Sequence, residues 1–155
     1  MARVIRLDIV EGKPRTIICA EAIENGLFVE IKGRAENAHL GAEVDYEAYE
    51  VELAKANTKR GALGFHASVC NMYDERLREQ DFVLEAGKPG RAYQLVLGDI
   101  VTIPMIDGVA VGNELVLADN GLLAVGSDGL FVVEEINAII PGYEKECMVI
   151  RVIAN

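Results

Sequence analysis

The sequence contains no tryptophan and is poor in aromatic residues, which make up 6% of its 155 residues. Binding surfaces for sugars are built from exposed aromatic rings, so this composition argues against a carbohydrate-stacking platform. No uninterrupted apolar run approaches the roughly 18–20 residues that cross a bilayer. The first residues, with Arg3, Arg6 and Asp8 among apolar neighbours, lack the apolar core of a secretion signal. We therefore expect no membrane partner and a protein made and folded in the cytoplasm.

Basic residues are also scarce. Fifteen Lys and Arg stand against 25 Asp and Glu, which gives a formal net charge of −10. A protein that binds nucleic acid needs a basic stripe to displace counterions from the phosphates, and no Lys/Arg cluster supplies one. The sequence thus predicts no nucleic-acid partner, and the acidity favours solubility.

Cysteine is limited to Cys19, Cys70 and Cys147, each set among apolar residues. No Cys-x-x-Cys pair occurs, which argues against a structural zinc site. An odd number of cysteines without a secretion signal is typical of reduced thiols that pack as small hydrophobes. We expect all three in the core.

Short apolar runs separated by glycine turns dominate the remainder, and hydrophobic residues make up 51% of the chain. Runs of four to six Val, Ile and Leu punctuated by Gly with Asp or Asn are typical of small β-barrels and sandwiches. The sequence therefore predicts a single all-β domain over residues 1–155, a barrel or a sandwich with one short helix at most. The expected strands are residues 3–10, 16–20, 27–31, 49–54, 61–70, 82–86, 92–97, 100–103, 109–111, 114–117, 122–125, 130–136 and 146–153, and residues 34–45 are expected to form a loop.

Several segments leave alternatives open. Residues 3–10 suit an extended N-terminal arm or an edge strand, and residues 11–14 suit a turn because Pro14 fixes its backbone. Residues 49–54 alternate strictly enough to favour a strand over a helix, whereas residues 73–80 are the best candidate for a short helix. Residues 146–153 are apolar on nearly both faces, which suits either a central strand or a subunit contact.

Few residues could support catalysis. On a strand, His66, Ser68 and Cys70 would share one face, but side chains at this spacing need a third group from elsewhere, and a packed histidine is the commoner outcome. The acidic residues around Asp74 do not follow the calcium-loop pattern, and no glycine-rich phosphate loop occurs. We therefore expect no enzyme activity, no catalytic residue, no cofactor and no metal.

The stretch from Phe65 to Glu135 resembles the decoration, or cement, proteins of tailed-bacteriophage capsids. The matching motifs are His66-Ala-Ser68, Tyr73-Asp-Glu-Arg76, Asp81-Phe82, Glu85-Ala-Gly87-Lys88, Arg91-Ala-Tyr93, Gly98-Asp99-Ile-Val-Thr, Val111-Gly112-Asn113 and Gly129-Leu-Phe-Val-Val-Glu-Glu135. The resemblance implies a β-rich virion protein that binds the major capsid protein on the capsid exterior. It further implies a homo-oligomer, with a trimer favoured, that locks neighbouring capsomers together, and it carries no catalytic residue.

Adhesion of this kind would depend on apolar anchors and exposed strand edges. The two terminal segments are the expected intersubunit contacts because termini can reach a neighbour without disturbing the core. The residues predicted to make these contacts are Val4, Ile5, Leu7, Ile9, Met148, Ile150 and Val152. The alternative function is a displayed β-sandwich that binds a carbohydrate or a receptor without catalysis.

Overall fold

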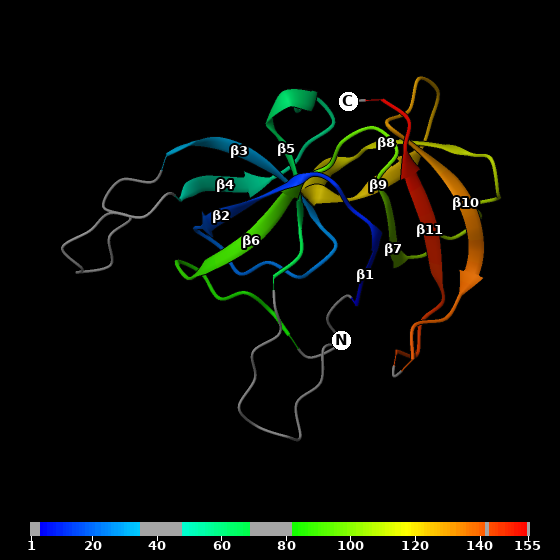
Figure 1. Ribbon diagram of the computed structural model, residues 1–155, viewed down its shortest axis with the longest axis horizontal. Helices are drawn as coiled ribbons and strands as arrows, with labels where there is room; N and C mark the ends of the chain where they lie inside the picture. Colours follow the sequence, from blue (N-terminus) through cyan, green and yellow to red (C-terminus); the bar gives the residue numbers. More distant parts are fainter. Residues whose placement is uncertain (1–3, 35–47, 69–81, 142, 155) are drawn as a thin grey trace.

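The computed structural model describes residues 4–34, 48–68, 82–141 and 143–154, and in them the chain is built from strands with short 3₁₀ turns. The strands form a closed five-stranded barrel beside a six-stranded sheet. Figure 1 shows the barrel on the left and most of the sheet on the right. We refer to the barrel strands and the segments between them as the barrel half. The sheet half comprises the sheet strands, the segments that join them and residues 95–99, which lead into the sheet.

The barrel half has the strand order β2-β4-β3-β5-β6. Its neighbouring strands are antiparallel, except that β2 and β4 run parallel and close the barrel together with the β2–β6 pair. The strands are β2 (Lys13–Cys19), β3 (Phe28–Arg34), β4 (Tyr49–Leu53), β5 (Leu63–His66) and β6 (Pro89–Gln94), and the 3₁₀ turn η1 (Arg60–Ala62) precedes β5.

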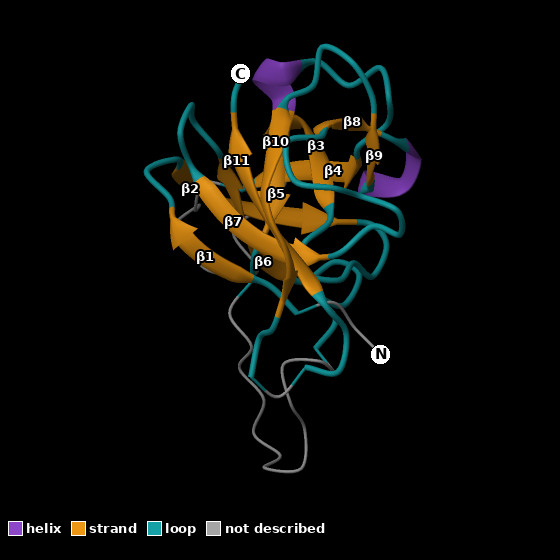
Figure 2. Ribbon diagram, turned by 90° about the vertical axis from the view of Figure 1, so that its right-hand side faces the viewer, coloured by secondary structure: helices purple, strands orange, loops and turns teal. Residues whose placement is uncertain are grey.

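The sheet half has the strand order β1-β7-β11-β10-β8-β9, with all neighbours antiparallel. Its strands are β1 (Arg6–Ile9), β7 (Ile100–Pro104), β8 (Glu114–Leu117), β9 (Leu123–Val125), β10 (Phe131–Ala138) and β11 (Cys147–Val152), and the 3₁₀ turn η3 (Asp119–Gly121) lies between β8 and β9. Strand β1 therefore occupies one edge of the sheet and β11 lies inside it, as Figure 2 shows.

One hydrophobic core joins the two halves. Phe28 and Phe65 of the barrel pack with Phe131 of the sheet, and the ring centroid of Phe28 lies 5.2 Å from that of Phe65 and 5.1 Å from that of Phe131. A second cluster fills the barrel around Ile17 and Val29. Alternate residues of β3 thus face the two clusters, since Phe28 points toward the sheet and Val29 into the barrel.

The all-β prediction is confirmed, and the structure contains both a barrel and an open sheet. Strand 49–54 is present as β4, and the C-terminal strand takes the central position as β11. Pro14, expected in a turn, lies in β2 opposite Tyr93 of β6. Residues 61–70 contribute a strand only at β5. The strands expected at 82–86 and 109–111 do not form: residues 82–86 contribute only an isolated bridge between Leu84 and Ile23, and residues 109–111 lie in the turns before β8. Most of the predicted loop at 34–45 and the predicted helix at 73–80 lie outside the described residues.

Candidate functional site

The structure separates the seven predicted contact residues into two groups. Met148, Ile150 and Val152 of β11 are 0–4% exposed and belong to the shared core. Val4 is 4% exposed, in a third cluster with Ile140, Tyr143 and Cys147. These four side chains are covered by their own chain, and this corrects their assignment to a surface contact.

The other three predicted residues lie in or next to the edge strand. Ile5 is half-buried against the shared core, whereas Leu7 is 37% and Ile9 56% exposed. Leu7 and Ile9 are therefore accessible to a second chain, and their role in such a contact stays a prediction.

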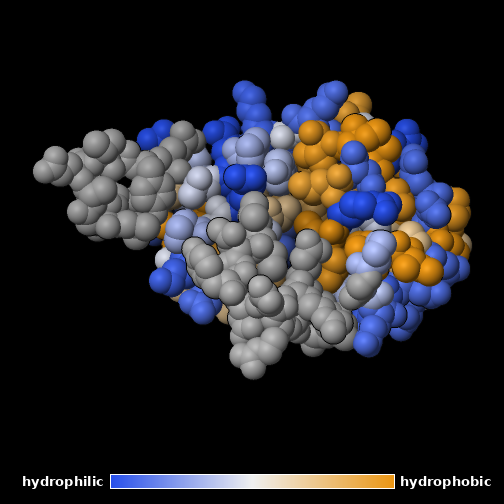
Figure 3. All heavy atoms as spheres, turned by 60° about the horizontal axis from the view of Figure 1, so that its bottom comes forward, coloured by the Kyte–Doolittle hydropathy of each residue, from blue (hydrophilic) through white to orange (hydrophobic). Residues whose placement is uncertain are grey.

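Exposed apolar side chains are concentrated on the sheet half. Among the described residues, nine large apolar side chains are exposed, and eight of them belong to sheet strands or to segments that enter or leave those strands. The eight are Leu7, Ile9, Val96, Leu97, Val111, Leu122, Val125 and Ile139, and the ninth is Val83. Figure 3 shows hydrophobic residues gathered on the side of the molecule that carries the sheet. Leu7 and Ile9 lie in β1 at one edge of the sheet and Val125 lies in β9 at the opposite edge, so the exposed apolar side chains are spread across the sheet half. Exposed apolar area of this kind can serve as an interaction surface.

Strand β1 carries a polar network on one side. The Arg6 Nε donates to Asp8 Oδ1 at 2.6 Å, and the Arg6 Nη2 donates to Thr102 Oγ1 at 3.2 Å. The Thr102 hydroxyl donates to Asp8 Oδ2 at 2.7 Å. Both charged side chains therefore lie over Thr102, which is fully buried.

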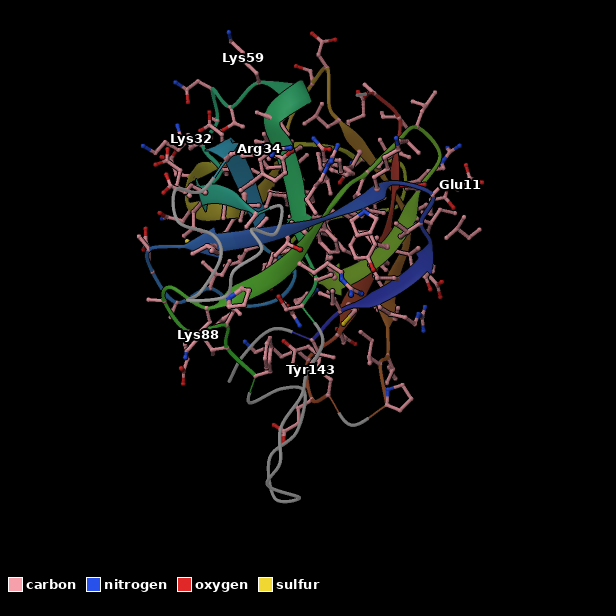
Figure 4. All side chains as sticks on the ribbon, turned by 60° about the vertical axis from the view of Figure 1, so that its left-hand side comes forward. Glu11, Lys32, Arg34, Lys59, Lys88 and Tyr143 are labelled. Carbon is pink, nitrogen blue, oxygen red and sulfur yellow. The ribbon has the colours of Figure 1, made fainter. Side chains whose placement is uncertain are left out.

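The barrel half carries an ion-pair cluster around Lys32. Lys32 Nζ lies 2.9 Å from Glu52 Oε1 and 3.2 Å from Glu30 Oε2. The hydrogen bond from Lys32 lowers the pKa of Glu52, and the hydrogen bonds to Glu52 and Glu30 raise the pKa of Lys32. Figure 4 shows Lys32 and Lys59 on the barrel half, while Glu11 lies at the turn that joins β1 to β2. Ion pairs therefore occur on both halves, since the sheet half carries the Arg6–Asp8 and Arg151–Glu134 pairs.

His66 and Ser68 are brought together as their spacing predicts. His66 Nε2 lies 2.7 Å from Ser68 Oγ, and Nδ1 lies 2.7 Å from the Glu24 carbonyl oxygen. A carbonyl can only accept, so Nδ1 carries the proton and Nε2 accepts from the Ser68 hydroxyl. That hydroxyl oxygen also accepts from the Arg91 backbone N–H at 3.1 Å. His66 is fully buried with both ring nitrogens bonded, which favours a structural role, and Cys70 lies outside the described residues.

Burial of His66 predicts a dependence of stability on pH. Desolvation lowers the pKa of its imidazole below the ordinary 6.5. The unfolded chain therefore takes up a proton at a higher pH than the folded chain, and stability falls as the pH drops from 6.5 toward the lowered pKa. We expect the urea midpoint to decrease over this range, and the decrease to be smaller in His66→Gln. Equal decreases in the wild-type protein and in His66→Gln would show that the pH dependence of stability does not come from His66.

Asp99, which the sequence singles out only as part of the Gly98-Asp99 motif, is a buried carboxylate. It is 2% exposed and accepts three backbone hydrogen bonds. Its Oδ1 accepts from Glu11 N at 2.9 Å, and its Oδ2 accepts from Gly12 N at 3.0 Å and from Val96 N at 2.9 Å. These bonds tie the segment between β1 and β2 to the segment between β6 and β7, which are the two crossings between the sheet and the barrel.

Among the described residues, no group of three or more His, Cys, Asp or Glu side chains is placed to hold a metal ion. In that same part of the chain, no helix is long and apolar enough to cross a membrane. Cys19 and Cys147 are buried, as predicted. Comparisons with protein-family models, with curated proteins and with solved structures found no match.

Proposed function

We propose that the chain is a virion structural protein that binds the outer surface of a bacteriophage capsid and stabilises contacts between capsomers. Its partner is the major capsid protein, and its site of action is the capsid exterior. The observation that carries the proposal is the concentration of exposed apolar side chains on the sheet half, which supplies an adhesive surface. The homo-oligomer, with a trimer favoured, follows from the resemblance to decoration proteins.

The motifs that carry the resemblance include turns that hold the sheet half in shape. The Gly98-Asp99 motif includes Gly98, whose φ is +92°, and Asp99, which bonds to both crossings. In the Val111-Gly112-Asn113 motif, the Asn113 Oδ1 accepts from the Ala110 N–H at 2.8 Å, and Gly112 N donates to the Val133 carbonyl. These motifs support the proposal through the shape of the sheet half, because they bring its exposed turns into a fixed arrangement.

The abundance of the chain in virions tests the function directly. We would measure its amount in purified virions of the phage or prophage that encodes it, relative to the major capsid protein. A near-stoichiometric ratio is expected for a shell component. Absence from virions would overturn the proposal and favour the displayed binding module.

Acidic substitutions on the sheet half are expected to weaken capsid binding. Leu97 and Ile139 are 61% and 74% exposed, so the single substitutions Leu97→Asp and Ile139→Asp should each leave folding intact while placing one charge in an apolar contact. We expect about a ten-fold loss of affinity in co-sedimentation with purified capsids. Val83→Asp adds the same kind of charge on the barrel half and serves as the control. An equal loss in the control would show that net charge, rather than the sheet half, governs binding.

A further inference from the structure

In the described part of the chain, the edge strand β1 has one side that no other strand covers. In the sheet order, β1 pairs with β7 on one side, and none of the described strands pairs with its other side (Figure 2). All four of its residues are exposed. The unpaired backbone N–H and C=O groups of an edge strand are a template for another strand, and natural proteins usually block such edges with charges or bulges.

The charges on this edge are arranged so that they match a second copy of themselves. Two antiparallel β1 strands with a two-fold axis at Leu7 place Leu7 opposite Leu7, and Arg6 opposite Asp8, in both directions. Opposite charges that face each other across neighbouring strands attract, whereas like charges repel. The pattern Arg6-Leu7-Asp8 therefore opposes pairing in other registers and favours this one.

The side chains lie on the faces that this pairing requires. Arg6 and Asp8 both bond to Thr102 Oγ1 and so share one face of the sheet, while the alternation of the strand places Leu7 on the other face. Arg6 uses its Nε and Nη2 within the chain, and the five N–H groups of a guanidinium leave donors for a second carboxylate. In the pair, Arg6 meets the Asp8 of the second copy on one face, and the two Leu7 side chains meet on the other.

The strand limits the extent of the contact. The pairing of β1 with β7 is regular at Arg6 and Leu7, and its register shifts at Asp8, between Leu7 and Ile9. Val4 is already buried in its own chain, so the contact is confined to residues 6–8. Leu7, 37% exposed, gains apolar contact at the centre. We propose that β1 is a self-complementary edge that pairs with β1 of a second copy of this chain about a two-fold axis.

The inference does not depend on the proposed capsid role because it is tested with the purified full-length chain alone. Sedimentation equilibrium should give a mass corresponding to an even number of chains: two if the β1 pair is the only contact, or six if the proposed trimer also forms. Asp8→Arg and Arg6→Asp each place like charges opposite each other and should give half the wild-type mass. An equimolar mixture of the two variants restores opposite charges and should recover the wild-type mass.

The matched control lies in the same sheet. Glu134 on β10 pairs with Arg151 of β11 at 2.6 Å, so Glu134→Arg also creates a like-charge pair, but inside the sheet. This variant should keep the wild-type mass. Thermal unfolding of every variant shows whether each remains folded, and recovery in the mixture separates lost pairing from lost folding.

A single cysteine on the edge tests the register. In the proposed pair, the Cβ atoms of residue 7 lie about 4.5–5.5 Å apart, whereas the two copies of residue 9 are separated by about 13 Å along the strands. Mild oxidation should link Leu7→Cys into a disulfide dimer, and Ile9→Cys should remain at the wild-type background. The proposal would be overturned if the mass corresponded to a single chain or an odd number of chains and Leu7→Cys formed no disulfide dimer. It would also be overturned if Leu7→Cys and Ile9→Cys formed disulfide dimers to the same extent.

Discussion

Replacing Phe28 by alanine is expected to lower the free energy of unfolding by about 3–5 kcal/mol. Phe28 is 1% exposed, and its ring lies between Phe65 of the barrel and Phe131 of the sheet. It also lines a small cavity of about 30 Å³ between the two halves, which truncation would enlarge. The loss combines the transfer free energy of the ring with the cost of the added cavity. Urea denaturation of the purified protein measures the change.

Two comparisons sharpen this prediction. Phe82→Ala removes the same atoms from a half-buried site beside the barrel cluster, so its cost should be clearly smaller. Phe28→Leu keeps most of the apolar volume and should recover part of the loss. If Phe28→Ala cost no more than Phe82→Ala, the barrel and the sheet would not depend on a common core.

The strands were predictable where the pattern of side chains follows local geometry. Tyr49, Val51 and Leu53 alternate with two glutamates, and this segment is β4. Residues 100–103 are all β-branched and three of them are aliphatic, which suits a strand covered on both faces, and β7 is such a strand. The prediction of a turn at Pro14 was wrong because proline also occurs in strands at positions where no backbone N–H is needed for pairing, as in β2.

The assignment of β11 to a subunit contact shows what a pattern leaves undetermined. Met148, Ile150 and Val152 face the shared core, while Cys147 on the other face packs with Val4, Ile140 and Tyr143. A strand that is apolar on both faces must pack against other segments on each face. Its sequence does not say whether the segment on the second face comes from its own chain or from another one.

Contacts between distant segments were the hardest to foresee. The spacing of His66 and Ser68 predicted that they share a face, but the acceptor for Nδ1 comes from Glu24, 42 residues earlier. Asp99 follows a glycine in what reads as an ordinary turn, and two of its donors lie 87 and 88 residues away. Patterns of this kind describe one segment at a time, whereas these hydrogen bonds depend on how the barrel and the sheet come together.

Replacing Asp99 by alanine is expected to cost about 3 kcal/mol or more of unfolding free energy. The change leaves the backbone N–H groups of Glu11, Gly12 and Val96 without their acceptor, and the Gly12 bond is buried. A buried donor without an acceptor destabilises the folded state by its full desolvation free energy. The same change loosens both crossings between the halves, so amide hydrogen exchange should accelerate at Gly12 and Val96 along with the loss of global stability.

The asparagine variant distinguishes acceptor loss from a simple loss of volume. Oδ2 accepts two of the three bonds, so an amide oxygen at that position in Asp99→Asn could keep Gly12 and Val96 bonded. Its NH₂ group would then face the Glu11 N–H, where a donor meets a donor. The free energy of unfolding of Asp99→Asn should thus lie between those of the wild-type protein and Asp99→Ala.

The control variant alters a carboxylate in an exposed turn. Asp107→Ala should change the free energy of unfolding by about 0.5 kcal/mol or less. Equal costs for Asp99→Ala and Asp107→Ala would show that the Asp99 hydrogen bonds do not hold the sheet half against the barrel.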